Sequence, residues 1–329
     1  MMKAIQMTRF GGPEVLDSVE LPLPEPGTGQ VRLRVRAAGV NFAETLMREN
    51  RYAMTPPLPS VPGCEVAGTI DALGDGVTGL APGTRVAAAL FAAGVYFGGY
   101  ADHVVVDASA VVPLPDALTF EDAAALPVQG LTALALTRHV PIRGRSVLVT
   151  AAAGGVGSLL LQLLRRAGAG RVIALAGSSA KCAIARDLGA DVAIDYRAPS
   201  WQAAVREATG GIGPDVVFDS VGGDITPACL ALLAPRGALV IYGALNIHAF
   251  ALGVPELLGL IFRNQSIAGF ALAPLLTPQG LRDDLAQLFE LVLTGALRLT
   301  VTALPLAEAA EAHRRLEGRA STGKLVLLP

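Results

Sequence analysis

The hydrophobic and polar positions of this chain follow two different periods. Up to about residue 120, short segments alternate apolar and polar residues, as in V-R-L-R-V-R-A from Val31, and glycines and prolines separate them. A period of two is typical of strands with one face in water. This region is therefore predicted to be β-rich, with one short helix at Asn41, where N-F-A-E has the spacing of a capping box.

Continuous apolar runs alternate with helical patterns from Ser146 onward. S-V-L-V-T, R-V-I-A-L-A, V-A-I-D, D-V-V-F-D and A-L-V-I-Y are predicted strands, and helices are predicted between the first four of them. This order predicts a parallel sheet covered on both faces. Helices over 280–293 and 306–316 and a final strand K-L-V-L-L follow. The predicted fold class is α/β, with a β-rich domain and a doubly wound parallel sheet domain.

Length and composition narrow the possible functions. A chain of 329 residues predicts two domains, and a net charge of −2 argues against nucleic acid or an anionic membrane as partner. Its three cysteines form no C-x-x-C, which favours a reducing, cytoplasmic compartment. No signal peptide or membrane span is expected. Lysine occurs only at Lys3, Lys181 and Lys324.

The glycine-rich segment A-A-A-G-G-V-G lies between the predicted strand S-V-L-V-T and an apolar helix. This order is typical of dinucleotide binding, because glycines let the backbone approach a pyrophosphate at the helix N-terminus. Ala152 replaces the first glycine of the usual G-x-G-x-x-G, whereas Gly154, Gly155 and Gly157 remain around Val156. Tight packing of helix on strand would also use glycines, but the alternating strands and helices that follow favour a cofactor.

The end of the second predicted strand distinguishes the nicotinamide cofactors. An NAD site usually has an acidic residue there, about 20 positions after the glycines, which binds the ribose 2′-hydroxyl. Here A-L-A-G-S-S-A-K follows instead, so Ser178, Ser179 and Lys181 offer donors to a 2′-phosphate, and Tyr196 and Arg197 follow the next strand. Ser178 or Ser179 also suits a helix cap, which is compatible with phosphate binding. The sequence predicts NADPH.

Five longer motifs occur in order along essentially the whole chain: N-F-A-E-T-L-M-R-E-N-R-Y, V-P-G-C-E-V-A-G, A-A-A-G-G-V-G, F-D-S-V-G-G and L-E-G-R-A-S-T-G-K-L-V-L-L-P. They resemble the medium-chain dehydrogenase/reductase superfamily, and within it the zinc-independent quinone oxidoreductases of the zeta-crystallin-like branch. The resemblance implies a GroES-like domain over 1–122, a Rossmann NADPH-binding domain over 123–264 and a return to the first domain over 265–329. It also implies a homodimer.

The resemblance assigns roles to single residues. Asn41 matches an asparagine beside the nicotinamide, and Tyr52 matches a tyrosine facing the substrate; both are expected to be catalytic. A helix cap for Asn41, packed rings for Tyr52 and Phe270 and a solvated charge for Arg319 are the structural alternatives. The expected cofactor-binding residues are Asn41, Thr132, Gly154, Gly155, Val156, Gly157, Ser178, Lys181, Tyr196, Ser220, Gly243, Phe270 and Arg319.

Cys64, beside Glu65 in V-P-G-C-E-V-A-G, raises the question of a metal site. A catalytic zinc needs three ligating side chains aimed at one point. Zinc alcohol dehydrogenases of the same superfamily have cysteine at the position of Asn41 and histidine at that of Cys64, and they have a four-cysteine lobe that is absent between Arg85 and His103. The four histidines show no ligand spacing. We therefore expect no metal, and a buried, unreactive Cys64.

A site without a metal suits an acceptor that is already electrophilic. The predicted function is NADPH-dependent reduction of a quinone or other conjugated carbonyl compound, in which Asn41 orients the nicotinamide and Tyr52 donates a hydrogen bond to the acceptor or steers it. Two alternatives remain open. One is an enoyl or enone reductase of natural-product or lipid metabolism, and the other is a non-catalytic NADPH-binding redox sensor.

Overall fold

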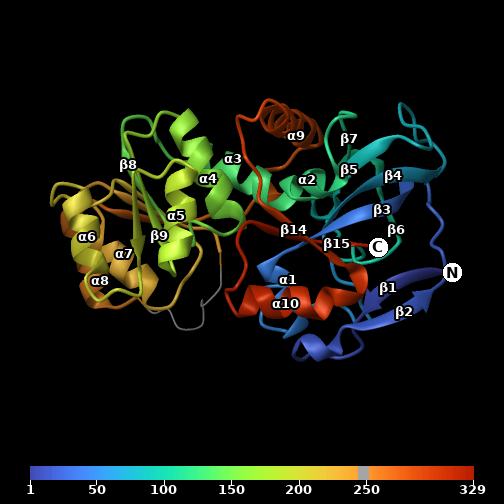
Figure 1. Cartoon of the computed structure of the whole chain (residues 1–329), viewed down its shortest axis with the longest axis horizontal. Helices are drawn as coiled ribbons and strands as arrows, with labels where there is room; N and C mark the ends of the chain where they lie inside the picture. The colour runs from blue at the N-terminus through green and yellow to red at the C-terminus, as the bar shows by residue number, and fades with distance from the viewer. Residues whose placement is uncertain (244–251) are drawn as a thin grey trace. The chain divides into compact units, whose positions relative to one another are not determined.

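The computed structural model describes residues 1–243 and 252–329, and its contacts divide the chain into two compact units (Figure 1). One unit comprises Met1–Leu131 and Ala273–Pro329, and the other comprises Thr132–Leu272. The sequence-based boundaries, after 122 and 264, fall slightly earlier. Helix α2 (Phe120–Ala124) packs against strands of the first unit, which keeps the chain there beyond residue 122.

The first unit is built on a seven-stranded sheet in the order β14-β15-β3-β4-β5-β7, with β6 also paired to β3. Strand β15 pairs antiparallel with β3, so the C-terminal segment completes the sheet that the N-terminal region begins. A separate β1–β2 ribbon completes the unit. The strands are β1 (Met2–Gln6), β2 (Asp17–Leu21), β3 (Gln30–Val40), β4 (Glu65–Leu73), β5 (Arg85–Ala89), β6 (His103–Asp107), β7 (Val111–Pro113), β14 (Val301–Pro305) and β15 (Lys324–Leu328).

Strand β3 confirms the alternation predicted from the sequence. Val31, Leu33 and Val35 are buried in the core of the first unit, and the arginines between them face outward or lie at its edge. The helices of this unit are α1, α2 and two helices near the C-terminus, and a π-helical turn, η4 (Leu126–Gly130), follows α2. Their bounds are α1 (Phe42–Arg48), α9 (Pro278–Leu293) and α10 (Ala309–Glu317).

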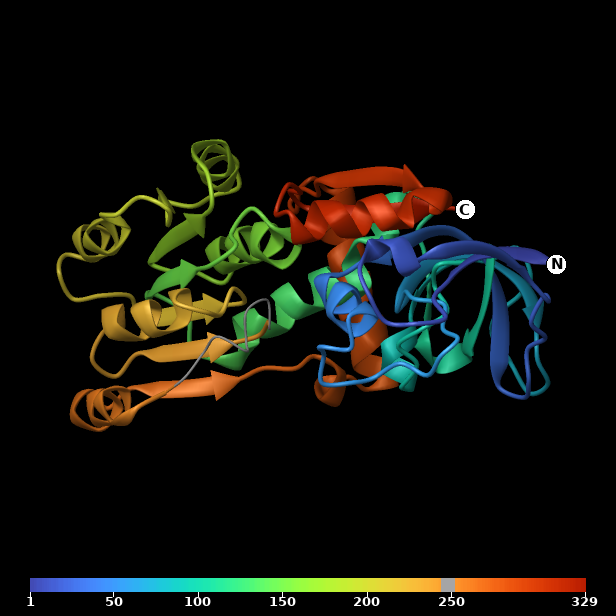
Figure 2. The same ribbon diagram turned by 90° about the horizontal axis from the view of Figure 1, so that it is seen from below.

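The second unit contains a six-stranded, all-parallel sheet in the order β10-β9-β8-β11-β12-β13. Numbered within the unit, this is the order 3-2-1-4-5-6 of the Rossmann fold, so the predicted doubly wound sheet is confirmed. Helices lie on both sides of it (Figure 2). The strands are β8 (Ser146–Val149), β9 (Arg171–Ala176), β10 (Val192–Asp195), β11 (Val216–Asp219), β12 (Ala238–Ile241) and β13 (Ser266–Gly269).

The central strands of this sheet are fully buried, as their continuous apolar sequences predict. Val147, Leu148 and Val149 of β8 have no exposed surface. Within the described residues, no helix has the length and apolar content needed to cross a lipid bilayer. The helices are α3 (Leu131–His139), α4 (Gly155–Arg166), α5 (Ser179–Asp187), α6 (Trp201–Ala208), α7 (Ile225–Leu232) and α8 (Val254–Arg263).

Candidate active site

The glycine turn lies at the point where the strand order of the parallel sheet reverses, between β8 and β11. Strand β8 ends at Val149, Gly154 is the N-cap of α4, and the helix begins at Gly155. The first N–H groups of a helix have no partner within it, so they can bind an anion. At Gly157 an added Cβ would lie 2.4 Å from the carbonyl oxygen of Ala151. Only glycine lets α4 pack this closely on the turn.

Alanine at position 152 is explained by the backbone of the turn. The left-handed conformation falls one residue earlier, at Ala151, with φ of 47°. Ala152 is fully buried, and its N–H donates to the carbonyl of Leu175 at 3.0 Å. The first glycine of the usual motif can therefore be replaced without placing positive φ at the replaced position.

Asp219, at the end of β11, organises the switch point and was not among the predicted site residues. It is fully buried, accepts a hydrogen bond from the Thr150 hydroxyl at 2.7 Å and another from the N–H of Val221 at 2.9 Å. The N–H of Ser220 in turn donates to Thr150 Oγ1 at 3.1 Å. These bonds join the end of β8 to the end of β11. The F-D-S-V-G-G motif contains Asp219, but the sequence gives no sign of its partner.

The predicted 2′-phosphate residues come together where β9 and β10 end. Ser178 caps α5 and its hydroxyl accepts a hydrogen bond from the N–H of Lys181 at 3.2 Å. Tyr196 donates its N–H to Ala176 at 3.1 Å, and its hydroxyl lies against Gly177, where an added Cβ would be 2.9 Å away. Cap and candidate phosphate site thus use the same helix end.

Arg197 is engaged elsewhere. Its guanidinium pairs with Asp195, with Nη2 3.0 Å from Oδ2. This pairing lowers the pKa of the Asp195 carboxyl. Among the two candidates that follow β10, the structure therefore favours Tyr196 over Arg197 as a neighbour of Ser178.

Three further predicted residues follow the ends of β11, β12 and β13. Ser220 and Gly243 are adjacent, because a Cβ on Gly243 would lie 2.5 Å from the Cβ of Ser220. Phe270 donates its N–H to Ile241 at 2.9 Å, and its half-buried ring packs edge-on against His139. These residues share the carboxyl edge of the sheet with the glycine turn and the Ser178 cluster. Thr132 is buried in the first turn of α3.

Asn41 lies in the first unit, at the start of α1, and its helix-capping position is confirmed. Its N–H donates to Glu44 at 2.9 Å. Its side-chain amide meets two charged residues that sequence reasoning missed: Nδ2 donates to Glu65 Oε1 at 2.8 Å, and Oδ1 accepts from Lys324 Nζ at 2.8 Å. Lys324 and Glu65 also form an ion pair.

A buried polar chain continues from Glu44. Tyr100 donates its hydroxyl to Glu44 at 2.5 Å and lies 3.3 Å from Nε2 of His313, whose Nδ1 is 3.0 Å from the guanidinium of Arg48. Burial raises the pKa of the Glu44 carboxyl, although the hydrogen bonds from Tyr100 and from the Asn41 N–H oppose this. The only sequence signal was the spacing of Asn41 and Glu44.

Cys64 forms no disulfide and lies beside Asn41, with Sγ 3.8 Å from Nδ2. It is half-buried, not fully buried as the sequence predicts, because it lies in the loop just before β4. Burial raises the pKa of its thiol well above the usual value, and Glu44 and Glu65 add to the rise. A thiol that stays protonated is a poor nucleophile and metal ligand. Asn41, already bound to Lys324, offers zinc no anionic donor. In the described part of the chain, which excludes His248, His, Cys, Asp and Glu form no group of three able to hold a metal.

Tyr52 and Arg319, the remaining predicted residues, also belong to the first unit. Tyr52 is 37% exposed, and its pKa is raised by partial burial and by neighbouring Cys64 and Tyr96. Arg319 is exposed and follows α10 in a left-handed conformation, with φ of 54°. Asn41, Cys64 and Tyr52 therefore form one neighbourhood, and Arg319 lies on another segment of the unit.

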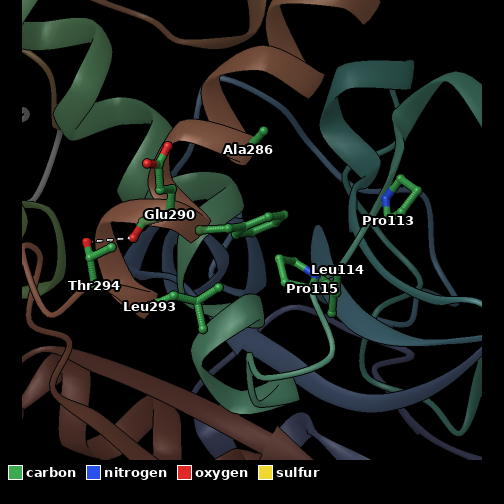
Figure 3. A pocket seen from close by; sticks show the side chains of 8 residues that line it. Pro113, Leu114, Pro115, Ala286, Glu290, Leu293 and Thr294 are labelled. Carbon is green, nitrogen blue, oxygen red and sulfur yellow. Dashed lines mark hydrogen bonds between the residues drawn. The ribbon is translucent and has the colours of Figure 1, made fainter.

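A separate hollow of about 590 Å³ lies between β7 and α9 of the first unit (Figure 3). It is lined mainly by apolar side chains, and the Thr294 hydroxyl at its edge donates to the carbonyl of Glu290 at 2.8 Å. None of the predicted site residues lines it. The hollow thus offers a polar substrate few hydrogen-bonding groups. Its lining residues are Pro113, Leu114, Pro115, Ala286, Phe289, Glu290, Leu293 and Thr294.

Two family models match this chain. The family model described as alcohol dehydrogenase GroES-like domain matches residues 27–116, and that described as zinc-binding dehydrogenase matches residues 155–293. A quinone oxidoreductase of Pseudomonas aeruginosa is 39% identical, and a 2-haloacrylate reductase of a Burkholderia species is 35% identical. The alignments cover all of this chain, with 100% and 99% of those relatives.

A solved structure extends the likeness to the whole fold. The Escherichia coli quinone oxidoreductase complexed with NADPH aligns with a TM-score of 0.91 and 33% identity. The alignment covers 99% of this chain and 100% of that one. Both the motif resemblance and the fold expected from it are confirmed, and the chain is an oxidoreductase. It belongs to the zinc-independent quinone oxidoreductase branch of the medium-chain dehydrogenase/reductase superfamily.

Proposed function

We propose that this oxidoreductase transfers a hydride from NADPH to a quinone or another conjugated carbonyl compound, without a metal ion. The observation that carries the proposal is the cluster of Ser178, Lys181 and Tyr196, with no carboxylate at the end of β9. A carboxylate there would bind a 2′-hydroxyl and repel a 2′-phosphate. The NADPH complex of the E. coli relative supports the same cofactor.

We assign the cofactor's phosphate groups to residues at the carboxyl edge of the parallel sheet. The N–H groups of the glycine turn suit the pyrophosphate, and Lys181 suits the 2′-phosphate. When bound, NADPH supplies a hydride from C4 of its nicotinamide ring. The proposed cofactor residues are Asn41, Thr132, Gly154, Gly155, Val156, Gly157, Ser178, Lys181, Tyr196, Ser220, Gly243, Phe270 and Arg319.

Asn41 and Tyr52 are the proposed catalytic residues. Asn41 would orient the nicotinamide, and Tyr52 would donate to the carbonyl oxygen of the acceptor, on which negative charge develops. A tyrosine hydroxyl is already protonated at neutral pH, and partial burial raises the pKa of Tyr52 further, so the group can donate. Water would supply the final proton. An acceptor with a conjugated carbonyl needs this positioning more than it needs a Lewis acid.

A second candidate is reduction of a conjugated C=C bond in an enone or an enoyl compound. The 2-haloacrylate reductase relative supports it, because a 2-haloacrylate has a double bond next to a carboxyl group. The same residues would serve, since hydride addition to a conjugated carbon also places charge on the carbonyl oxygen. The acceptor panel below separates the two candidates.

Cofactor preference tests the assignment of Lys181. We expect NADPH to be used in preference to NADH, and Lys181→Ala to lower kcat/KM for NADPH by about 10-fold or more while kcat/KM for NADH stays unchanged. Steady-state NAD(P)H oxidation measures both values. Lys3→Ala is the control, because it removes the same charge from an exposed site in the other unit. Equal use of both cofactors by the unchanged protein would contradict the proposal.

An acceptor panel of quinones and enones tests Tyr52. We expect Tyr52→Phe to lower kcat/KM for the preferred acceptor by about 10-fold, because one hydrogen bond to the developing oxyanion is lost, while KM for NADPH stays the same. Tyr96→Phe is the matched control, since Tyr96 is a half-buried neighbour of Tyr52. If Tyr52→Phe and Asn41→Ala both leave turnover unchanged, the catalytic assignment is wrong.

We further propose a cytoplasmic homodimer that associates through α8 and the edge strand β13. Val254, Ile261 and Phe262 of α8 are 67%, 67% and 80% exposed, and β13 ends the six-stranded sheet. Exposed apolar side chains beside an open strand edge are typical of an interface. A monomeric mass by light scattering would contradict the dimer.

The proposed cytoplasmic location rests on the three cysteines, which form no disulfide and suit a reducing compartment.

A further inference from the structure

Lys324 and Glu65 form a buried ion pair to which the proposed function gives no role. Lys324 is 2% exposed, whereas Lys3 is exposed and Lys181 is half-buried. Glu65 is fully buried. Burying two charges is costly even when they pair, so a buried ion pair is weak evidence for a purely stabilising role. The pair therefore calls for a role other than stability.

The surroundings of Glu65 are shaped to hold its carboxylate in one place. Oε1 faces Lys324 and Asn41, and Oε2 accepts the N–H of Val128, in η4, at 2.7 Å. An added Cβ on Gly39 would lie 2.3 Å from Oε1, so glycine on β3 provides the space. Four segments far apart in the chain thus converge on Asn41 and its two charged partners.

The two charges allow only one orientation of the Asn41 amide. An ammonium group only donates hydrogen bonds and an ionised carboxylate only accepts them. Oδ1 must therefore face Lys324, and Nδ2 must face Glu65; each contact is 2.8 Å long. A flip of the amide would place NH₂ against an ammonium and oxygen against a carboxylate. Neither charge alone would exclude the flip as strongly as the pair does.

We propose that the Lys324–Glu65 ion pair is a positioning device that fixes the amide of Asn41 for contact with the nicotinamide ring. This rests on the proposed function, in which Asn41 orients that ring. Lys324 and Glu65 do not themselves touch the cofactor; they are positioning residues that act through Asn41. The C-terminal strand β15 thereby contributes to hydride transfer through a residue 283 positions from Asn41.

A double-mutant cycle between Lys324 and Asn41 tests the proposal. Lys324→Met is expected to lower kcat by about 10- to 100-fold and to weaken NADPH binding, because a misplaced positioning group carries a cost of this size. Affinity for 2′,5′-ADP, which lacks the nicotinamide, is expected to stay unchanged. In the Asn41→Ala background, Lys324→Met should have almost no further effect on kcat, since Lys324 acts through Asn41. Unchanged kcat in folded Lys324→Met, or effects that multiply, would overturn the proposal.

Lys324→Met leaves Glu65 as an unpaired buried charge, which destabilises the fold. A second variant therefore separates the effect on kcat from the effect on stability. Lys324→Met combined with Glu65→Gln removes both charges and keeps the shape of the carboxyl group. We expect the Tm of this double variant to lie near that of the unchanged protein, and its kcat still to be lowered. A double variant whose kcat equals that of the unchanged protein would overturn the proposal. If the unchanged protein does not oxidise NADPH with any quinone or enone of the acceptor panel, the proposed function fails instead. The ratio of NADPH to 2′,5′-ADP affinity then still tests the positioning role.

Discussion

Replacing Gly157 by alanine is expected to weaken NADPH binding by about 100-fold. The added Cβ would lie 2.4 Å from the carbonyl oxygen of Ala151 and 2.8 Å from the Cα of Ala152. Both neighbours are backbone atoms, which cannot rotate away as a side chain can. To reach ordinary contact, the start of α4 must move by about 1 Å, and the N–H groups proposed to hold the pyrophosphate move with it.

Fluorescence titration with NADPH measures this effect, and a thermal melt shows whether the second unit stays folded. Gly259→Ala is the control, because an added Cβ there meets nothing within 4 Å and alanine favours helix α8. We expect it to bind NADPH as the unchanged protein does. Gly154→Ala should be intermediate, since its Cβ would lie 3.1 Å from the same carbonyl. Full NADPH affinity in Gly157→Ala would contradict the role of the turn.

The elements best predicted from the sequence are those whose burial follows a simple period. Strand β3 alternates, and the central strands of the second unit, such as β8, are continuously apolar. Helices α7 and α8 and strand β13 were not predicted. The apolar face of α8 is exposed, and β13 is a short, partly exposed edge strand, so neither is a fully buried apolar segment like the central strands of the unit.

Only those residues of the candidate site that lie near the end of a predicted strand could be predicted from the sequence. The glycine turn, Ser178 and Tyr196 follow the ends of strands, and Lys181 lies in the first turn of the helix that Ser178 caps. The carboxyl ends of parallel strands share one edge. Glu65 was different. The sequence placed it beside Cys64 as a possible metal ligand, whereas its carboxylate faces Lys324, 259 positions away. No local pattern could indicate a pairing across that separation.

The buried polar chain from Arg48 to Glu44 also joins residues far apart in the sequence, and no local pattern indicates it. Its hydrogen bonds all run in one direction, from donor to acceptor. A guanidinium only donates, so Nδ1 of His313 must accept, and its Nε2–H then faces the hydroxyl of Tyr100, which donates to Glu44. His313 is therefore neutral in the folded protein, because a second proton would face the guanidinium. Burial, with Arg48, lowers the pKa of His313 to about 3.

Stability is expected to fall in mild acid because of this histidine. The unfolded chain protonates His313 below pH about 6.5, whereas the folded chain resists protonation down to about 3, so acid favours the unfolded state across that window. The stabilising contribution is fully present above pH about 6.5 and decreases as the pH falls. By pH 5 the loss attributable to this group is about 2 kcal/mol. Urea unfolding at a series of pH values measures it.

Comparison with His313→Gln separates the contribution of His313 to the pH dependence of stability from the contribution of the carboxyl groups. Glutamine can still accept from Arg48 and donate to Tyr100, but it has no proton to gain, so the difference between pH 7 and pH 5 should shrink by about 2 kcal/mol. His103→Gln is the control. Burial lowers the pKa of His103 as well, but neighbouring Asp71 opposes this, so the variant should remove much less of the dependence. An unchanged pH dependence in His313→Gln would show that protonation of His313 does not oppose folding, and that the hydrogen-bond direction inferred from Arg48 is wrong.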